Sequence, residues 1–206
     1  MKPDEVRLSY AALGSDATQY AVVAVLSGQM TYAAIVAPTD PNRWTRIAVA
    51  DCWCKYELTG QDVLHEFVGL HPAPGFIPRE LQPFELVLRA SGGGTGIYVQ
   101  NEVHFRIRNR ELRQVMSFVS RRRSCVPTDP QQKCDLEARW FVPAMVRGKS
   151  GGILVEGRGE YGPDKTLNVR ELEDRHLRHT SCREYAWNDA RFRYEPIAQS
   201  TSCNQQ

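Results

Sequence analysis

The residues from Ile97 to Ile107 form the longest regular pattern in the chain, an alternation of apolar and polar side chains. One set of positions carries mostly apolar residues: Ile97, Val99, Val103, Phe105 and Ile107, with Asn101 as the exception. The other set carries Tyr98, Gln100, Glu102, His104, Arg106 and Arg108. Successive side chains of a strand point to opposite faces of a sheet. The pattern therefore predicts a long strand with an apolar buried face and a polar solvated face.

The segments on either side extend this strand into a larger unit. Residues 84–89 alternate in the same way, and the glycine-rich residues 91–96 fit a hairpin loop because glycine readily adopts a positive φ. Residues 108–111 look like a second turn. Residues 112–119 match both a strand and the i, i+3, i+4, i+7 spacing of a helix. We favour a strand, because the segment follows a tight turn and contains Val and Phe, which predicts a three-stranded antiparallel meander.

The rest of the chain repeats the pattern of short strands and turns. Strands are expected at 20–26, 30–36, 136–142, 152–161, 183–187 and 191–194, with a loop at 145–152 and one helix at 59–69. We predict one all-β or β-dominated domain over residues 1–206, with one or two short helices and a polar tail from about residue 198. The antiparallel meanders would form a sandwich, a barrel or a small propeller-like array.

The cysteines suggest an oxidising compartment. There are six of them: Cys52, Cys54, Cys125, Cys134, Cys182 and Cys203. Cys125 and Cys134 bracket a polar, proline-containing loop, and a bond between Cys182 and Cys203 would tie the tail to the body. Cys52 and Cys54 would point the same way on a strand, which does not suit a bond between them. An even number of cysteines in loop-bracketing positions predicts disulfides and a periplasmic or secreted protein. The alternative is a set of buried free thiols in the cytoplasm.

No targeting or membrane-spanning segment is evident in the sequence. The apolar stretch at 20–37 is interrupted by Ser27, Gly28 and Gln29, which leaves two strand-length pieces. The first residues lack the basic start and apolar core of a signal peptide. The protein is therefore expected either to stay inside the cell or to be a mature form with an added Met1.

Three patterns that could indicate a chemical site fall short of their usual requirements. The glycine cluster at 92–96 has no following lysine and leads into a strand, unlike a phosphate-binding loop. The spacing Cys52-x-Cys54 has no second cysteine pair, which a structural zinc site usually needs. His176, His179 and Cys182 would share a face only on a helix, and the sequence that follows is strand-like. We predict no catalytic residue, metal or cofactor.

The most suggestive surface is basic. The net charge of +2 does not indicate a binding partner. However, 21 of the 26 basic residues are arginine, which favours bidentate contacts to carboxylate and phosphate. The candidate binding residues are Tyr98, His104, Arg106, Arg108, Arg113, Arg121, Arg122 and Arg123.

We expect this Arg-rich sheet face to hold an acidic protein or a polyanion. Few aromatic residues accompany the arginines, so nucleic acid is not favoured. The hypothesis is a non-enzymatic binding or inhibitor-type protein. The alternatives are a hydrolase-type enzyme on an envelope or extracellular substrate, and a structural subunit that assembles through sheet edges.

Overall fold

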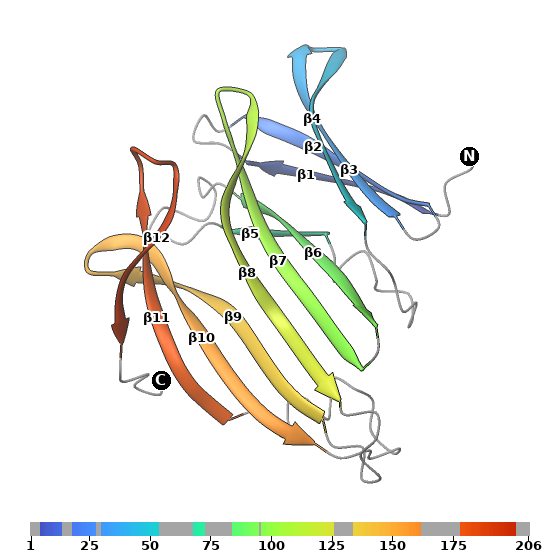
Figure 1. Ribbon diagram of the computed structural model, residues 1–206. Helices are drawn as coiled ribbons and strands as arrows, with labels where there is room; N and C mark the ends of the chain where they lie inside the picture. The colour runs from blue at the N-terminus through green and yellow to red at the C-terminus, as the bar shows by residue number, and fades with distance from the viewer. Residues whose placement is uncertain are drawn as a thin grey trace.

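The structure is a computed structural model, which describes residues 5–13, 18–27, 30–53, 68–72, 84–94, 96–125, 134–161 and 178–200. The described residues form twelve strands and no helix (Figure 1). The strands are β1 (Glu5–Ala12), β2 (Gln19–Ser27), β3 (Met30–Asp40), β4 (Arg43–Trp53), β5 (Val68–Pro72), β6 (Phe84–Gly94), β7 (Ile97–Arg108), β8 (Glu111–Cys125), β9 (Cys134–Val146), β10 (Lys149–Tyr161), β11 (Arg178–Asn188) and β12 (Arg193–Ser200).

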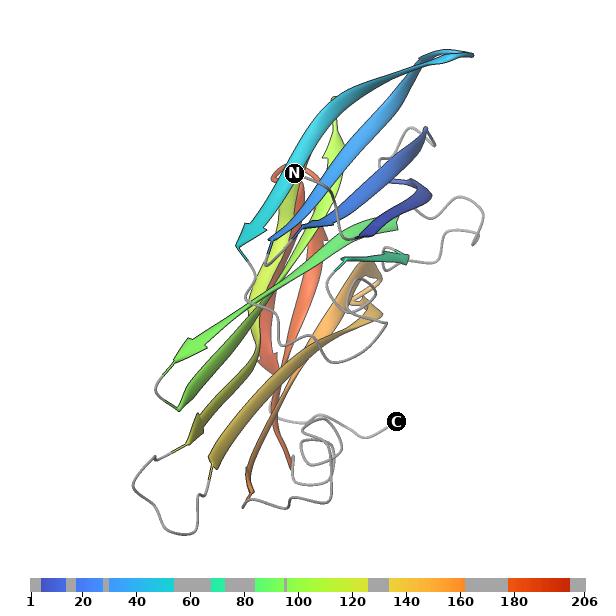
Figure 2. The same ribbon diagram turned by 90° about the vertical axis from the view of Figure 1, so that its right-hand side faces the viewer.

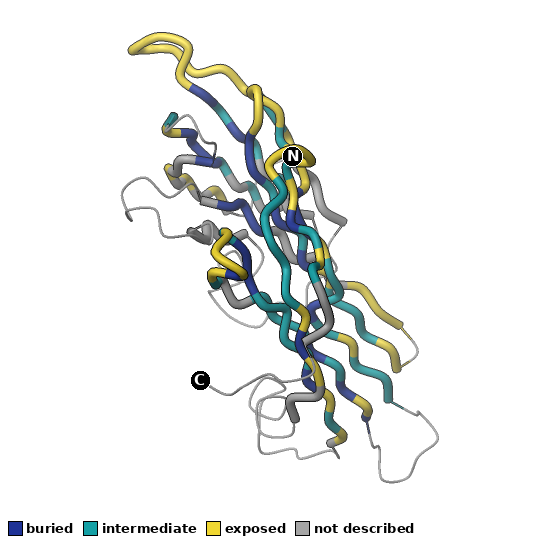
Figure 3. The backbone as a smooth tube through the Cα atoms, turned by 90° about the vertical axis from the view of Figure 1, so that its left-hand side faces the viewer, coloured by how far each residue is buried: buried dark blue, intermediate teal, exposed yellow. Residues whose placement is uncertain are grey.

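The strands form two antiparallel meanders in which each strand pairs with its neighbours in sequence. β1–β4 make a four-stranded sheet, and β5–β12 make an eight-stranded sheet with β5 and β12 at its two edges. The larger sheet therefore does not close into a barrel. Figure 2 shows the β3–β4 hairpin extending well beyond the other strands, and the residues of its tip are exposed (Figure 3).

The eight-stranded sheet bends so that its second half covers its first. β8 pairs with β9 only where Arg121–Cys125 meets Cys134–Ala138. Beyond that point, side chains of β9, β11 and β12 pack on the face of β7 and β8 instead of extending the ladder. This gives a sandwich-like arrangement, one of the architectures expected from the sequence.

Strands β6–β8 form a middle layer with apolar contacts on both faces. On one face, Leu86 and Ile107 pack with Tyr20, Val22 and Ile35 of the small sheet. On the other face, a second cluster joins β8 to the later strands through Val115, Met116, Phe118, Phe141, Leu154, Tyr185, Trp187, Phe192 and Tyr194. A strand in this position has no solvated face, which determines where its polar side chains lie.

Two bulges in β8 adjust it to this position. The β7–β8 register shifts between Gln100 and Asn101 and again between His104 and Phe105, which leaves Ser120 and Val115 as the extra residues on β8. Extra residues of this kind increase the local twist of a strand pair. Ser120 is buried, and its hydroxyl donates to the backbone carbonyl of Gln100 at 3.2 Å.

The predicted meander of residues 84–119 is confirmed, and residues 112–119 are strand. Only Val68 and Gly69 of the predicted helix at 59–69 are described, and both belong to β5. His71 and Pro72 also belong to β5, an edge strand, where a proline need not cost a ladder hydrogen bond. The tail predicted from about residue 198 is strand as far as Ser200.

The loop expected at 145–152 is wrong: the turn is only Arg147 and Gly148, and β10 begins at Lys149. Gly151 and Gly152 lie inside the strand because neighbouring atoms approach them closely. A Cβ on Gly151 would lie 2.2 Å from the carbonyl oxygen of Tyr185, and one on Gly152 would lie 2.3 Å from the ring of Phe141. Glycine at these two positions therefore allows the neighbouring strand and the Phe141 ring to pack closely against β10.

Replacing Gly152 by Ala is therefore expected to lower the free energy of unfolding by about 1–3 kcal/mol, the usual cost of overpacking. The Phe141 ring belongs to the cluster between the two halves of the large sheet and cannot move away freely. Urea denaturation measures the change. Gly94→Ala is the matched control, because a Cβ there meets nothing within 4 Å. Equal stability of the two variants would contradict the packing described here.

Candidate functional site

A group of ionisable side chains is buried between the middle layer and the second half of the large sheet. His104 on β7 is at its centre and is 5 % exposed. Its Nδ1 lies 2.9 Å from Oε2 of Glu85 on β6, and its Nε2 lies 2.9 Å from Oε1 of Glu102 on β7. Both carboxylates are themselves buried. We refer to Glu85, Glu102, His104, Arg106 and Tyr194 as the ion cluster.

The two carboxylates keep His104 protonated. Burial alone would lower the pKa of His104, but the hydrogen bonds to Glu102 and Glu85 and the charges of both groups raise the pKa to about 9. With both ring nitrogens donating, the imidazolium has no lone pair available to accept a proton. His104 is therefore a positive charge held between two negative ones, and it cannot act as a general base in this arrangement.

Tyr194 connects this charge pair to β12. Its hydroxyl donates to Oε1 of Glu85 at 2.6 Å, so Glu85 accepts one hydrogen bond from β7 and another from a strand 109 residues away in sequence. Burial, together with the charge of Glu85 and the hydrogen bond to it, raises the pKa of the Tyr194 phenol. The phenol therefore stays a neutral donor across the physiological range.

Arg106 supplies the second positive charge and is held by aromatic rings. Its guanidinium carbon lies 4.3 Å from the ring centroid of Trp187 and 5.7 Å from that of Phe192. The side chain is 9 % exposed, and its Nε has no hydrogen-bond partner. Aromatic faces attract a desolvated guanidinium. The guanidinium carbon of Arg108, at the exposed end of β7, lies 5.2 Å from the ring centroid of Phe192.

The ion cluster is suited to holding two layers together. It contains two positive and two negative side chains, so the buried charges balance. A single buried charge would be costly, but paired and hydrogen-bonded charges are tolerated. Tyr194 and Trp187 attach the β11–β12 hairpin to β6 and β7 through these contacts. Sequence reasoning missed Glu85 and Tyr194, whose partners lie on other strands, and it placed Glu102 on a solvated face.

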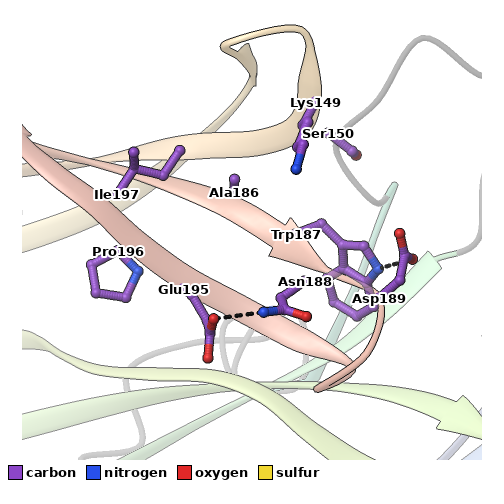
Figure 4. A pocket seen from close by; sticks show the side chains of 9 residues that line it. All are labelled: Lys149, Ser150, Ala186, Trp187, Asn188, Asp189, Glu195, Pro196 and Ile197. Carbon is purple, nitrogen blue, oxygen red and sulfur yellow. Dashed lines mark hydrogen bonds between the residues drawn. The ribbon is translucent and has the colours of Figure 1, made fainter.

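A pocket of about 560 Å³ lies at the β11–β12 hairpin, apart from the charged members of the ion cluster (Figure 4). Its lining residues are Lys149, Ser150, Ala186, Trp187, Asn188, Asp189, Glu195, Pro196 and Ile197. Its acidic groups already accept hydrogen bonds. Trp187 donates to Asp189 at 2.8 Å, and Asn188 donates to Glu195 at 2.7 Å. Hydrogen bonds from Asn188 and two arginines lower the pKa of Glu195. These groups fix the hairpin tip.

The outward face of the β1–β4 sheet is apolar and exposed. The inward side chains of β2 and β3 belong to the core, so the residues between them face outward. One row crosses all four strands, from Leu8 to Val23, Ala34 and Val49. Leu8 is 55 % exposed and Val49 is 50 % exposed. The other large exposed apolar residues of this sheet are Val6, Tyr10 and Trp44. We call this surface the apolar face.

An aromatic pair covers one end of the apolar face. The rings of Tyr10 on β1 and Trp44 on β4 are 6.1 Å apart, although β2 and β3 lie between these strands in the sheet. Ala21 pairs with Tyr10 and is 3 % exposed, whereas Val23 and Val25 further along β2 are partly exposed. The two aromatic rings therefore cover the Tyr10 end of the apolar face, and the rest of the face, from Leu8 onward, is exposed to solvent.

The predicted binding residues do not form one open surface. Tyr98, His104 and Arg106 share the predicted face of β7, but the expectation that this face is solvated is wrong for the last two, which are buried. The reason is the middle-layer position of β7. Arg108 and Arg113 are exposed near the β7–β8 turn, where Arg113 pairs with Glu111.

The three consecutive arginines among the candidates belong to β8. Alternation along the strand separates them: Arg122 is exposed, whereas Arg121 and Arg123 are partly buried. Arg123 lies 5.6 Å from the ring of Tyr98, and its Nε is buried without a hydrogen-bond partner. Whether these residues bind an anion stays a prediction.

The predicted bond between Cys125 and Cys134 is confirmed, and it joins β8 to β9 at the end where these strands pair. Cys182 is also disulfide-bonded, but its expected partner Cys203 lies outside the described residues, as does Cys54. Among the described residues, no group of three His, Cys, Asp or Glu side chains is arranged to hold a metal ion. His176 belongs to the undescribed part.

The part of the chain that the structure describes contains no helix long and apolar enough to cross a membrane. Comparison of the sequence and fold with protein-family models, curated proteins and solved structures finds no match.

Proposed function

We propose that this protein is a non-enzymatic binding protein of the periplasmic or secreted space, and that the apolar face is its contact surface for another protein. The single observation that supports the proposal is the exposure of Leu8, Tyr10 and Val49, each at least half exposed, on one face of a sheet. Contiguous exposed apolar patches on soluble proteins commonly mark interaction sites. The disulfide is compatible with the proposed location.

The chemistry of the face favours a protein partner with an apolar surface of its own. The row Leu8, Val23, Ala34 and Val49 carries no polar atom in its side chains and can offer neither hydrogen bonds nor charge. Its gain on binding comes from removing apolar area from water. Aromatic residues such as Tyr10 and Trp44 at the edge of the patch are typical of protein interfaces.

The proposal departs from the arginine surface expected from the sequence. Arg106 is buried against Trp187, and the exposed arginines at the β7–β8 turn and in β8 are separated by strand alternation. The enzyme alternative has little support in the ion cluster, because both nitrogens of His104 are already engaged.

Photo-crosslinking tests the proposal. A benzoylphenylalanine residue replaces Val49 in one variant, Leu8 in a second and Ile97, a 45 % exposed residue of β7, in the control. In an extract of cells that carry the gene, we expect one protein species to be captured from both β1–β4 positions and not from Ile97. The purified species should then bind the wild type and lose binding to Leu8→Asp. Capture that is identical from all three positions would contradict the proposal.

A further inference from the structure

We infer that a second copy of this chain can occupy the apolar face, so that two β1–β4 sheets stack face to face in a twofold dimer. The inference rests on the proposed function, because it names the partner of the same surface. The β1–β4 sheet is already covered on its inward side by the middle layer. A second sheet on the outward side would complete a sandwich of which the described residues provide one side.

The lack of charge makes the face compatible with itself. In a twofold dimer each patch meets an identical patch, so any net charge on it would face a like charge. The row Leu8, Val23, Ala34 and Val49 has none. Arg46, opposite Val36, and Asp51, opposite Tyr32, occupy the β4 positions of the outward rows on either side of it. A charged partner protein would form no ion pair with this row, whereas a second copy of the row would bury apolar area against it.

The shape of the face also suits a copy of itself. Two sheets with the same right-handed twist pack aligned, with their strands within about 30° of each other. The Tyr10–Trp44 pair covers one end of the face, and Val6, Val25 and Tyr32 occupy the outward row at the other end. A twofold axis along the Leu8 row would place the Tyr10–Trp44 end of each copy over the Val6 row of its partner, so that the two aromatic pairs do not meet each other.

The available area limits the strength of such a dimer. Four strands spaced about 4.8 Å apart, over three outward rows about 6.7 Å apart, cover roughly 400 Å² per copy. The dimer would bury about 800 Å² in total, which is below the range of stable specific interfaces. We therefore expect a weak dimer that forms only at high protein concentration.

Sedimentation velocity of the full chain from about 10 μM to about 1 mM tests the inference, because a weak dimer accumulates only toward the upper end of this range. The wild type should shift from monomer to dimer. Leu8→Asp should raise the dissociation constant more than about tenfold, since the twofold axis places two buried carboxylates in one interface. Ile97→Asp is the control, because Ile97 is also an exposed apolar residue, at 45 %, and lies away from the apolar face. It should dimerise like the wild type, and thermal unfolding should show all three proteins folded.

The outcomes separate this inference from the proposed function. A wild type that stays monomeric at all concentrations overturns the second-copy inference. If the Val49 crosslinker still captures another protein in that case, the proposed function stands. A dimer that Leu8→Asp leaves intact overturns the inference in favour of pairing between edge strands such as β4. Absence of both the dimer and the capture would count against the proposed function as well.

Discussion

Replacing Glu85 by Gln is expected to lower the free energy of unfolding by about 3 kcal/mol or more, the usual result of breaking a buried ion pair. The amide keeps the shape of the side chain and an acceptor for the Tyr194 hydroxyl. It removes the negative charge that His104 faces at 2.9 Å, leaving two buried positive charges with one carboxylate. Urea denaturation at pH 7 measures the loss.

Glu156→Gln is the control for this substitution. Glu156 also accepts hydrogen bonds from charged side chains, Arg139 at 3.3 Å and Arg158 at 3.0 Å. Burial would raise the pKa of its carboxyl, but the two arginines outweigh burial and lower the pKa. Arg158 is largely exposed, and solvent-screened pairs contribute little, so we expect a loss below about 1 kcal/mol. If the two variants lost equal stability, Glu85 could not be part of a buried network.

Raising the pH from about 6.5 to about 9 should destabilise the protein through His104. The pKa of this residue is about 9 in the folded protein, whereas the ordinary value for a histidine side chain, taken for the unfolded chain, is 6.5. The folded state therefore binds the proton more tightly, and its contribution to stability is complete below pH 6.5. That contribution is lost as the pH rises through 9, and a difference of this size corresponds to about 3 kcal/mol.

The measurement is the free energy of unfolding by urea at several pH values for the wild type and for His104→Gln. The difference between the two isolates the titration of His104 from that of other groups. We expect the difference to shrink steadily above pH 6.5, while the raised pKa of Tyr194 keeps that phenol neutral throughout. A difference that stays constant between pH 6 and pH 9 would show that His104 is not held by two carboxylates.

Strand positions were readable from the sequence because side-chain alternation and turn residues are local properties. The alternation in β7 and the glycine-rich turn before it predicted the meander of β6, β7 and β8. The apolar runs of residues 20–26 and 30–36 likewise predicted β2 and β3. The Cys125–Cys134 bond followed from the loop that these residues bracket.

The surroundings of the strands were not readable in the same way. A polar set such as Glu102, His104 and Arg106 looks the same whether water or another layer covers it. Its burial depends on Tyr194 and Trp187, which come from strands much later in the chain. The mixture of acidic and basic residues on one face was the available hint, because a buried set must balance its charges.

The apolar face had a clearer signal. The consecutive apolar residues of β2, from Tyr20 to Leu26, place apolar side chains on both faces of the strand. Such runs usually belong to strands covered on both sides. The structure covers one side with the middle layer and leaves Leu8 and Val49 of the same sheet exposed on the other. The sequence pattern therefore predicts a covering layer on the second side of this sheet, and the described part of the chain does not provide one.

Hydroxyl-radical footprinting with mass spectrometry tests most directly that the polar face of β7 is covered while the apolar face is open. Tyr10 and Tyr194 form a matched pair, at 60 % and 5 % exposure. In dilute protein we predict that Tyr10 is oxidised roughly tenfold faster than Tyr194, in proportion to exposed area. Tyr10 should become protected as the protein concentration rises, while Tyr194 stays unchanged. Equal oxidation of the two tyrosines, or faster oxidation of Tyr194, would contradict the arrangement of layers on which the proposed function depends.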